Sequence, residues 1–405
     1  MKDEVILKAQ QAVEKQATNE EPVDLGRFRE ESEEHPYLED LRELPEEKQR
    51  AMRLAGVDVT GKGRSGTFIQ EDHSVIHTSV LDDGIEVLSI AEALEKYDWL
   101  EDYYWRAVSV DADRYTAVTE LKGRKGYFVR ALPGVKAVYP VQACLYIGKE
   151  GLLQSVHNII IVEEGANLHV ITGCTTGHDV GSGMHIGVSE VFVKKNAKLT
   201  FTMVHSWAEE VVVRPRTSVI VEDGGVFLSN YICMRPVRDV QMYPTTYLVG
   251  KNSVGRYHSI LVAQPHSHLD VGSRVVLQGE GSRAEIIARS LTKGGTVINR
   301  GHLVGAVSGV KGHLECRGLM LSKEGRIYAI PELEARADGV ELSHEAAVGK
   351  IAEEEIEYLM ARGLTEDEAT ATIVRGFLNV KIMGLPPELE EEINQAIEQS
   401  DESYI

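Results

Sequence analysis

Residues 158–330 contain a repeat of nearly constant length, and this feature limits the possible folds more than any other. Each copy has an alternating apolar segment, a Gly or Asn turn residue and a second alternating segment, as in NIIIVEEGANLHV. The turn residues follow at steps of 31, 28, 28, 29 and 28 residues: Gly165, Asn196, Gly224, Asn252, Gly281 and Gly309. Gly and Asn tolerate the left-handed backbone of a sharp corner, and a fixed period indicates a repeat architecture.

The residue content of each copy decides between repeat architectures. Helical repeats are excluded because Gly, Asn and β-branched residues would break the helices. Propeller blades are about 40–50 residues long, which exceeds this period. Aliphatic strand residues and an aromatic content of only 6% favour a parallel β-helix over up-and-down β structure. We therefore predict a mainly β protein with a β-helix core at 151–342, a helical and mixed α/β domain at 1–150, and a helical domain at 343–405.

Charge and composition argue against several classes of protein. The net charge of −20 argues against a surface for nucleic acid or anionic membrane. No segment has the ~18–20 apolar residues of a membrane helix, and the charged N-terminus is unlike a signal peptide, so we expect a cytoplasmic protein. The cysteines form no CxxC pair, which argues against a disulfide framework or a one-chain zinc ribbon. They are Cys144, Cys174, Cys233 and Cys316.

Three short motifs have a functional and a structural interpretation. GVDVTGKG at 56–63 resembles a phosphate loop, but Gly63 replaces the hydroxyl residue that would bind magnesium, so a glycine-rich turn is favoured. HSH at 266–268 is expected to place two histidines on one strand face, and since no third metal ligand can be named, an exposed polar face is favoured over a metal site. The stretch at 173–187 suits either a zinc site or a loop leaving a β coil, and the loop is favoured. Its ligand candidates are Cys174, His178, Asp179 and His185.

The stretch ELSHEAAVGK at 341–350 follows the last repeat. If a helix begins near Ser343, its dipole holds Glu345 ionised and His344 neutral. The two side chains would then form a ligand pair for iron or zinc, or simply a helix N-terminus. Upstream, Cys316 lies in an apolar strand, where a lone cysteine is usually a small core residue.

Beyond residue 345 the pattern predicts helices. IAEEEIEYLMARG has apolar residues at near-helical spacing and ends at Gly363, a suitable C-terminal residue. TEDE is a capping box in which Thr365 and Glu368 satisfy backbone amides reciprocally. Pro386 and Pro387 end that segment, and an acidic helix is expected to follow.

Two C-terminal stretches resemble a known family: HLECRGLMLSKEGRIYAIPELEA and ELSHEAAVGKIAEEEIEYLMARGLTEDEATATIVRGF. They are similar to the C-terminal signature of SufB/SufD iron–sulfur cluster assembly scaffolds, and 173–207 resembles the family's core. The resemblance covers roughly 150–385, whereas the first 150 residues match poorly. It implies a right-handed parallel β-helix flanked by helical domains. It also implies C-terminal helices that dock a SufC-type ABC ATPase, and core subunits that pair through the ends of their β-helices.

The resemblance implies roles for individual residues. Cys316 matches the SufB cysteine implicated in building the nascent cluster. His344 and Glu345 match the acid–histidine pair beside it, and SufD contributes a histidine in the same region. Cys174 matches the SufB cysteine that receives sulfur inside the β-helix. The set resembles SufB more than SufD.

One departure from the SufB pattern affects the expected cluster. Many SufB proteins have an N-terminal CxxCxxxC motif, whereas no cysteine precedes Cys144 here. Cys144 and Cys233 match no family role. A four-iron cluster would need ligands from two chains or ligands other than cysteine, which favours a symmetric homodimer.

The sequence therefore predicts an assembly scaffold rather than an enzyme. It would receive sulfur and iron from donors, build a transient iron–sulfur cluster at a subunit interface and transfer it to apoproteins. The ABC-type ATPase would hydrolyse ATP, since this chain has no convincing phosphate loop. A structural adaptor that docks the ATPase without holding a cluster is the alternative. A β-helix carbohydrate enzyme is disfavoured, because carboxylates in 158–330 are scattered and aromatics are sparse.

Overall fold

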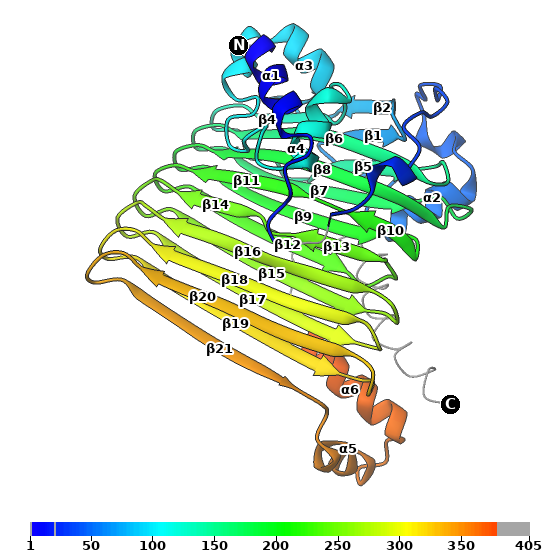
Figure 1. The fold of residues 1–405 in the computed structure, drawn as a ribbon, viewed down its shortest axis with the longest axis vertical. Helices are drawn as coiled ribbons and strands as arrows, with labels where there is room; N and C mark the ends of the chain where they lie inside the picture. The colour runs from blue at the N-terminus through cyan, green and yellow to red at the C-terminus, as the bar shows by residue number, and fades with distance from the viewer. Residues whose placement is uncertain (1, 20–21, 379–405) are drawn as a thin grey trace.

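The computed structural model describes residues 2–19 and 22–378, and most of it is a stack of strands wound into a solenoid (Figure 1). Two sheets face each other along the stack. Strands of each sheet pair in parallel along the solenoid, as a β-helix requires. The predicted mainly β class with a parallel β-helix core is confirmed. Among the described helices, none is long and apolar enough to cross a bilayer.

The first sheet has ten strands, and it contains most of the candidate residues. β1 and β2 are antiparallel, and the later neighbours are parallel. In spatial order the strands are β2 (Ser74–Val80), β1 (Gly66–Glu71), β5 (Val141–Ile147), β7 (Asn167–Thr176), β9 (Lys198–Ser206), β12 (Val226–Cys233), β15 (Val254–Ala263), β17 (Arg283–Thr292), β19 (Lys311–Met320) and β21 (Glu341–Gly349).

The second sheet has eleven strands and ends at β20, just as the first ends at β21. β3 and β4 are antiparallel, and the strands after them pair in parallel. In chain order the strands are β3 (Ile85–Ser89), β4 (Tyr127–Ala131), β6 (Leu152–Val162), β8 (Ser182–Val193), β10 (Glu210–Val213), β11 (Arg216–Val221), β13 (Asp239–Met242), β14 (Thr245–Leu248), β16 (His268–Leu277), β18 (Thr296–Gly305) and β20 (Arg326–Ala335).

The repeated turn residues form one column of left-handed corners. All six predicted positions have positive φ, including Asn196 and Asn252 at 55° each. Gly134 and Gly339 continue the column on either side, with φ of 75° and 71°. Asparagine side chains lie close to the next corner, because a Cβ added at Gly281 would be 2.5 Å from the Oδ1 atom of Asn252. The period read from the sequence is therefore the length of one coil.

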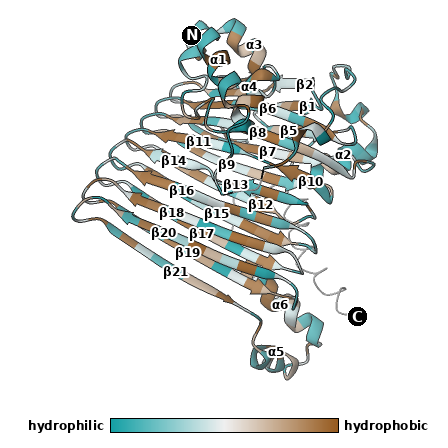
Figure 2. Cartoon of the chain, in the orientation of Figure 1, coloured by the Kyte–Doolittle hydropathy of each residue, from teal (hydrophilic) through white to brown (hydrophobic). Residues whose placement is uncertain are grey.

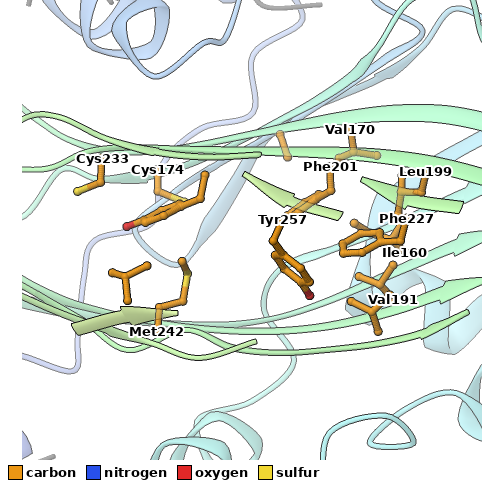
Figure 3. Close-up of a cluster of buried hydrophobic side chains, with 14 of the residues drawn as sticks. Ile160, Val170, Cys174, Val191, Leu199, Phe201, Phe227, Cys233, Met242 and Tyr257 are labelled. Atoms are coloured by element: carbon orange, nitrogen blue, oxygen red, sulfur yellow. The ribbon is translucent and has the colours of Figure 1, made fainter. Parts of the chain in front are cut away.

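Inward-facing side chains of the two sheets form the main hydrophobic core. Hydrophobic residues follow the strands along the whole stack (Figure 2). Val170, Phe201, Ser229 and Tyr257 form one inward row on successive strands of the first sheet. Figure 3 shows the three larger members of this row within the core. The row continues to His344 through the partners in β17 and β19, so His344 lies at the end of a continuous interior.

The parallel ladder extends beyond the predicted range of 151–342 at both ends. β1 and β5 already pair in parallel before residue 151, and β21 continues the ladder to Gly349. The predicted helix start near Ser343 is wrong, because residues 341–349 form a strand. Nine residues of this segment pair with β19, and this long-range pairing outweighs the local helical tendency of its alanines.

The region before residue 150 combines helices with strands. The helices are α1 (Lys2–Ala12), α2 (Glu46–Leu54), α3 (Ile90–Lys96) and α4 (Arg114–Leu121), with short 3₁₀ turns at Leu25–Arg27, Leu41–Glu43 and Asp98–Asp102. A buried Glu190 joins this region to β8, since it accepts hydrogen bonds from the backbone amides of Trp105, Ala107 and Val108. GVDVTGKG lies in turns between α2 and β1, without the preceding strand of a phosphate loop.

Two described helices follow the β-helix: α5 (Glu353–Met360) and α6 (Glu366–Leu378). The predicted capping box is present, because Thr365 and Glu368 each accept from the other's backbone amide. α6 packs Val374 and Leu378 against outward-facing apolar residues of the first sheet. The acidic helix expected after Pro387 lies outside the described residues.

Candidate functional site

The register between β19 and β21 separates residues that are adjacent in the sequence. Cys316 lies opposite Ala346, and Leu314 lies opposite His344. Because side chains alternate along a strand, Cys316 and His344 point to the same inward face. Glu345 lies opposite Glu315 and points outward. The predicted pair of His344 and Glu345 is therefore divided between the two faces of an edge strand.

Cys316 is a buried thiol near the open end of the β-helix. Only 1% of the residue is exposed. Burial, with a smaller contribution from the negative charge of Glu315, raises the pKa of Cys316 to about 11. The group is consequently a neutral thiol at neutral pH, and a bound metal ion would have to displace its proton.

His344 is half-buried on the same inward face. Its Nε2 atom is shielded from solvent and has no hydrogen-bond partner among the described residues. A buried imidazole nitrogen without a partner is costly unless a ligand or another molecule satisfies it. Cys316 and His344 together therefore offer a sulfur and a nitrogen donor to one small region of the interior.

Glu345 takes part in a different cluster on the outward face. His313, Glu315 and Glu345 each bring one potential ligand atom to within 4.8 Å of the others. Glu315 also forms ion pairs with Arg289 at 3.0 Å and Arg317 at 2.7 Å. His313 and Glu315 were missed by sequence reasoning, although their alternation in HLE places both on one strand face, opposite to Cys316.

Cys174 lies deep in the interior and far from the other candidates. It faces a cavity whose lining includes His185 and His205. Burial raises the pKa of Cys174 far above its usual range and lowers the pKa of His185 to about 3. Four strands separate β7 from β19, so at ~4.8 Å per strand Cys174 and Cys316 are ~24 Å apart.

The other motif residues are divided between strands and turns, and of the stretch 173–187, predicted as a loop, only residues 177–181 lie between β7 and β8. His178 lies in the loop between β7 and β8, where its ring nitrogens contact the carboxylates of Glu47 and Asp179. His185 belongs instead to β8, and its Nδ1 atom donates a hydrogen bond to Oε1 of Gln154. In HSH, His266 has a φ of 66° in a turn and only His268 is in a strand, so the two histidines do not share a strand face.

The last coil leaves the edges of both sheets unpaired within the described part of the chain. β20 and β21 each have one neighbouring strand in their own sheet. Large apolar residues are exposed on these two strands: Tyr328, Leu333 and Val348. Unpaired strand edges with exposed apolar side chains favour association with another chain.

Comparison with known proteins shows to which family the chain belongs. The family model described as "SUF system FeS cluster assembly, SufBD core domain" matches residues 145–377. The chain belongs to the SufBD family. Its function is therefore in iron–sulfur cluster assembly.

Individual SufBD relatives cover nearly the whole chain. An iron-sulfur cluster assembly SufBD family protein of Methanothermobacter thermautotrophicus is 52% identical, over 98% of each chain. One from Archaeoglobus fulgidus is 53% identical over 90% of this chain and 97% of its own length. One from Pyrococcus horikoshii is 32% identical over 89% and 82%. The SufBD core match runs from β5 to α6 and contains all the candidate residues named above.

Proposed function

We propose that this SufBD family protein is a scaffold subunit of a SUF-type assembly complex, which builds a nascent iron–sulfur cluster and transfers it to apoproteins. One observation carries the proposal. Cys316 and His344, whose Nε2 atom has no hydrogen-bond partner among the described residues, face the same end of the β-helix interior, on the last two strands of the first sheet. A site of this kind offers soft and borderline ligands for iron where a second subunit can approach.

The ligand set suits a cluster that must be released. Cys316 supplies a thiolate once iron displaces its proton, and His344 supplies a neutral imidazole. A site with one thiolate and one imidazole per chain holds a cluster less firmly than four thiolates would. The pKa of Cys316, raised to about 11 by burial, favours return of the proton when the cluster leaves.

Glu345 receives a separate role in this proposal. With His313 and Glu315 it forms a nitrogen and oxygen ligand set on the outward face. Such ligands suit ferrous iron before sulfide is added. Because Arg289 and Arg317 partly neutralise Glu315, iron would be held loosely there. Iron and sulfur would thus approach β21 from opposite faces.

A second core subunit would complete the site. The edges of β20 and β21 and their exposed apolar residues support pairing through the end of the solenoid. Two-fold symmetry in a homodimer would bring two copies of Cys316 and His344 to one interface. Four ligands from two chains would then be available to a cluster.

Sulfur would reach this interface through the interior. Cys174, as the sulfur acceptor, would hold it as a persulfide in the cavity beside His185 and His205. The inward faces of β7 to β19 form one continuous core between Cys174 and Cys316. A closed route of this kind would protect sulfane sulfur from water and oxidants.

A SufC-type ABC ATPase would dock on the C-terminal helices. α6 is linked to the site, because the Phe377 ring lies 5.9 Å from the guanidinium carbon of Arg289, and Arg289 pairs with Glu315. Movement of α6 would therefore disturb the residue next to Cys316. In this proposal the chain does not hydrolyse ATP itself and acts in the cytoplasm.

A structural adaptor that docks the ATPase without holding a cluster is the alternative. The two functions predict different results in cells whose iron–sulfur enzymes depend on this chain. A scaffold predicts that Cys316→Ala abolishes the activity of those enzymes, while the ATPase still co-purifies with the variant. Full enzyme activity with Cys316→Ala would support the adaptor, and failure to co-purify any ABC ATPase would contradict the docking role.

A further inference from the structure

A buried cluster of polar and sulfur groups lies inside the β-helix beside Cys174. Cys174 on β7 lies opposite His205 on β9, and His205 lies opposite Cys233 on β12. These side chains therefore form one inward-facing column on three consecutive strands. Figure 3 shows Cys174 and Cys233 near one another at the same end of the core.

Tyr231 links the members of this column. Its hydroxyl oxygen lies 2.9 Å from Nδ1 of His205, and its ring meets the imidazole edge-to-face at 5.0 Å. The pKa of Cys233 is raised to about 12 by burial, while a hydrogen bond with Tyr231 acts in the opposite direction. At most 4% of each of these residues is exposed. Tyr231 and His205 can carry a proton, and they thus link Cys233 to the position on β9 opposite Cys174.

We propose that Cys233 is a second sulfur carrier, which takes sulfane sulfur from a persulfide on Cys174 and moves it two strands closer to Cys316. The proposal rests on the proposed role of Cys174 as sulfur acceptor. The sulfur of Cys233 attacks the outer sulfur of the Cys174 persulfide. A new S–S bond forms at Cys233, and the S–S bond at Cys174 breaks with its electron pair remaining on Cys174.

The proton balance of this step uses His205. The proton of the Cys233 thiol passes to the imidazole, directly or through the Tyr231 hydroxyl, and then to the departing sulfur of Cys174. Burial lowers the pKa of His205 well below its usual range, so the neutral ring is a weak base and passes the proton on to the departing sulfur in the same step in which it receives it. One thiol and one persulfide exchange identities, and no oxidant or reductant is consumed.

The spacing of the two cysteines favours sulfur transfer over a disulfide. Two strand spacings separate their Cα atoms by ~9.6 Å. A disulfide needs Cα atoms within about 7 Å, so these thiols cannot be joined without movement of the backbone. A persulfide adds one S–S bond of ~2 Å to the reach of Cys174. The terminal sulfur can therefore approach Cys233 where the Cys174 thiol itself cannot.

The interior continues from Cys233 towards the site. A cavity whose lining includes Tyr231, Tyr257 and Ser259 begins beside the column. Ser259 lies in the same inward row as Cys316, through its partner Ala288. Cys144 has no place on this route, because it faces outward beneath α2 with Met52 and Val57. It therefore provides a matched control.

The test follows sulfur on the full-length protein. Wild type, Cys174→Ser, Cys233→Ser, His205→Gln and Cys144→Ser are exposed anaerobically to inorganic polysulfide, quenched with an alkylating reagent at successive times, and analysed by mass spectrometry for persulfide at each cysteine. Circular dichroism and thermal unfolding confirm that each variant is folded. In wild type and Cys144→Ser, the label should appear first at Cys174 and then at Cys233.

The variants distinguish transfer of sulfur from Cys174 to Cys233 from direct labelling of Cys233 by polysulfide. In Cys174→Ser the label at Cys233 should fall at least tenfold. In Cys233→Ser the persulfide label should stay at Cys174. His205→Gln should slow the appearance of label at Cys233 without reducing that at Cys174. Equal labelling of Cys233 in wild type and Cys174→Ser overturns the relay, as does labelling of Cys174 that never reaches Cys233. Absence of label at Cys174 overturns both the relay and the proposed sulfur acceptor.

Discussion

Cys316 and His344 lie diagonally across from each other on the inward face of β19 and β21, while Glu345 points to the opposite face. His344 and Glu345, although adjacent in sequence, therefore lie on different surfaces of the sheet. The inward surface offers sulfur and imidazole donors, and the outward surface offers carboxylates with the imidazole of His313. This division follows from the alternation of side chains in a strand. Metal binding at each surface can therefore be tested with separate variants.

The outward cluster should bind ferrous iron independently of Cys316. Glu345→Gln or His313→Ala should weaken anaerobic Fe²⁺ binding by ~10-fold or more, since even groups that only support metal ligands alter affinity by about 10–100-fold. Equilibrium dialysis measures this directly. Glu341→Gln is the matched control, because Glu341 lies on the same outward face but pairs with Lys311. The same Fe²⁺ affinity in all three variants would remove this site from the account.

The rate of alkylation of Cys316 should depend on pH, because burial raises the pKa of its thiol. The pKa is raised to about 11, from an ordinary value of 9.0. The rate with iodoacetamide should therefore rise steeply between about pH 9 and 11, whereas the unfolded chain should reach its plateau earlier. Because the folded state holds this proton more tightly, the contribution of Cys316 to stability is complete below pH 9 and lost towards pH 11. A midpoint near 9 in the folded protein would contradict this environment.

The corner column should be sensitive to an added Cβ. Gly281 has a φ of 72°, and its Cβ would lie 2.5 Å from Oδ1 of Asn252. Gly281→Ala should lower the free energy of unfolding by ~1–3 kcal/mol, from backbone strain and crowding. Chemical denaturation measures the loss. Gly349→Ala is the control, because no neighbouring atom lies within 4 Å of the added carbon and its φ is not positive. Equal stability of the two variants would contradict the predicted strain.

The contact between α6 and Arg289 should hold the helix against the sheet. Phe377→Ala removes the ring beside the Arg289 guanidinium, so amide hydrogen exchange within α6 should become faster. Tyr358→Ala in α5 is the control, because that ring contacts Arg362 and is exposed. Faster exchange of α6 in the Tyr358 variant alone would show that the helix is anchored differently.

Much of the fold could be predicted from the sequence because the repeat is a local signal. The left-handed corner requires Gly or Asn, so its spacing appears directly as Gly165, Asn196, Gly224 and their successors. The column of Cys174, His205 and Cys233 follows the same steps of 31 and 28 residues. Residues that are one coil length apart lie side by side on neighbouring strands, so this spacing is a sequence signal for the buried cluster.

The conformation of ELSHEAAVGK could not be predicted from the sequence in the same way. Its alanines and glutamates favour a helix locally, and only pairing with a strand some 30 residues earlier makes it extended. The error also concealed the division between His344 and Glu345, because residues adjacent on a helix terminus can share a ligand whereas strand neighbours point apart. The family resemblance supplied the residues, and the register supplied their separation.

The most direct test of the account is anaerobic reconstitution with iron and sulfide, followed by visible absorption and Mössbauer spectra. Wild type and Cys144→Ala should load a cluster equally. In Cys316→Ala the amount of cluster bound per chain should fall by about tenfold or more. In His344→Ala the amount bound should also fall, and the Mössbauer spectrum of the iron should change. Cluster loading of Cys316→Ala and His344→Ala equal to that of wild type would contradict the proposed scaffold site.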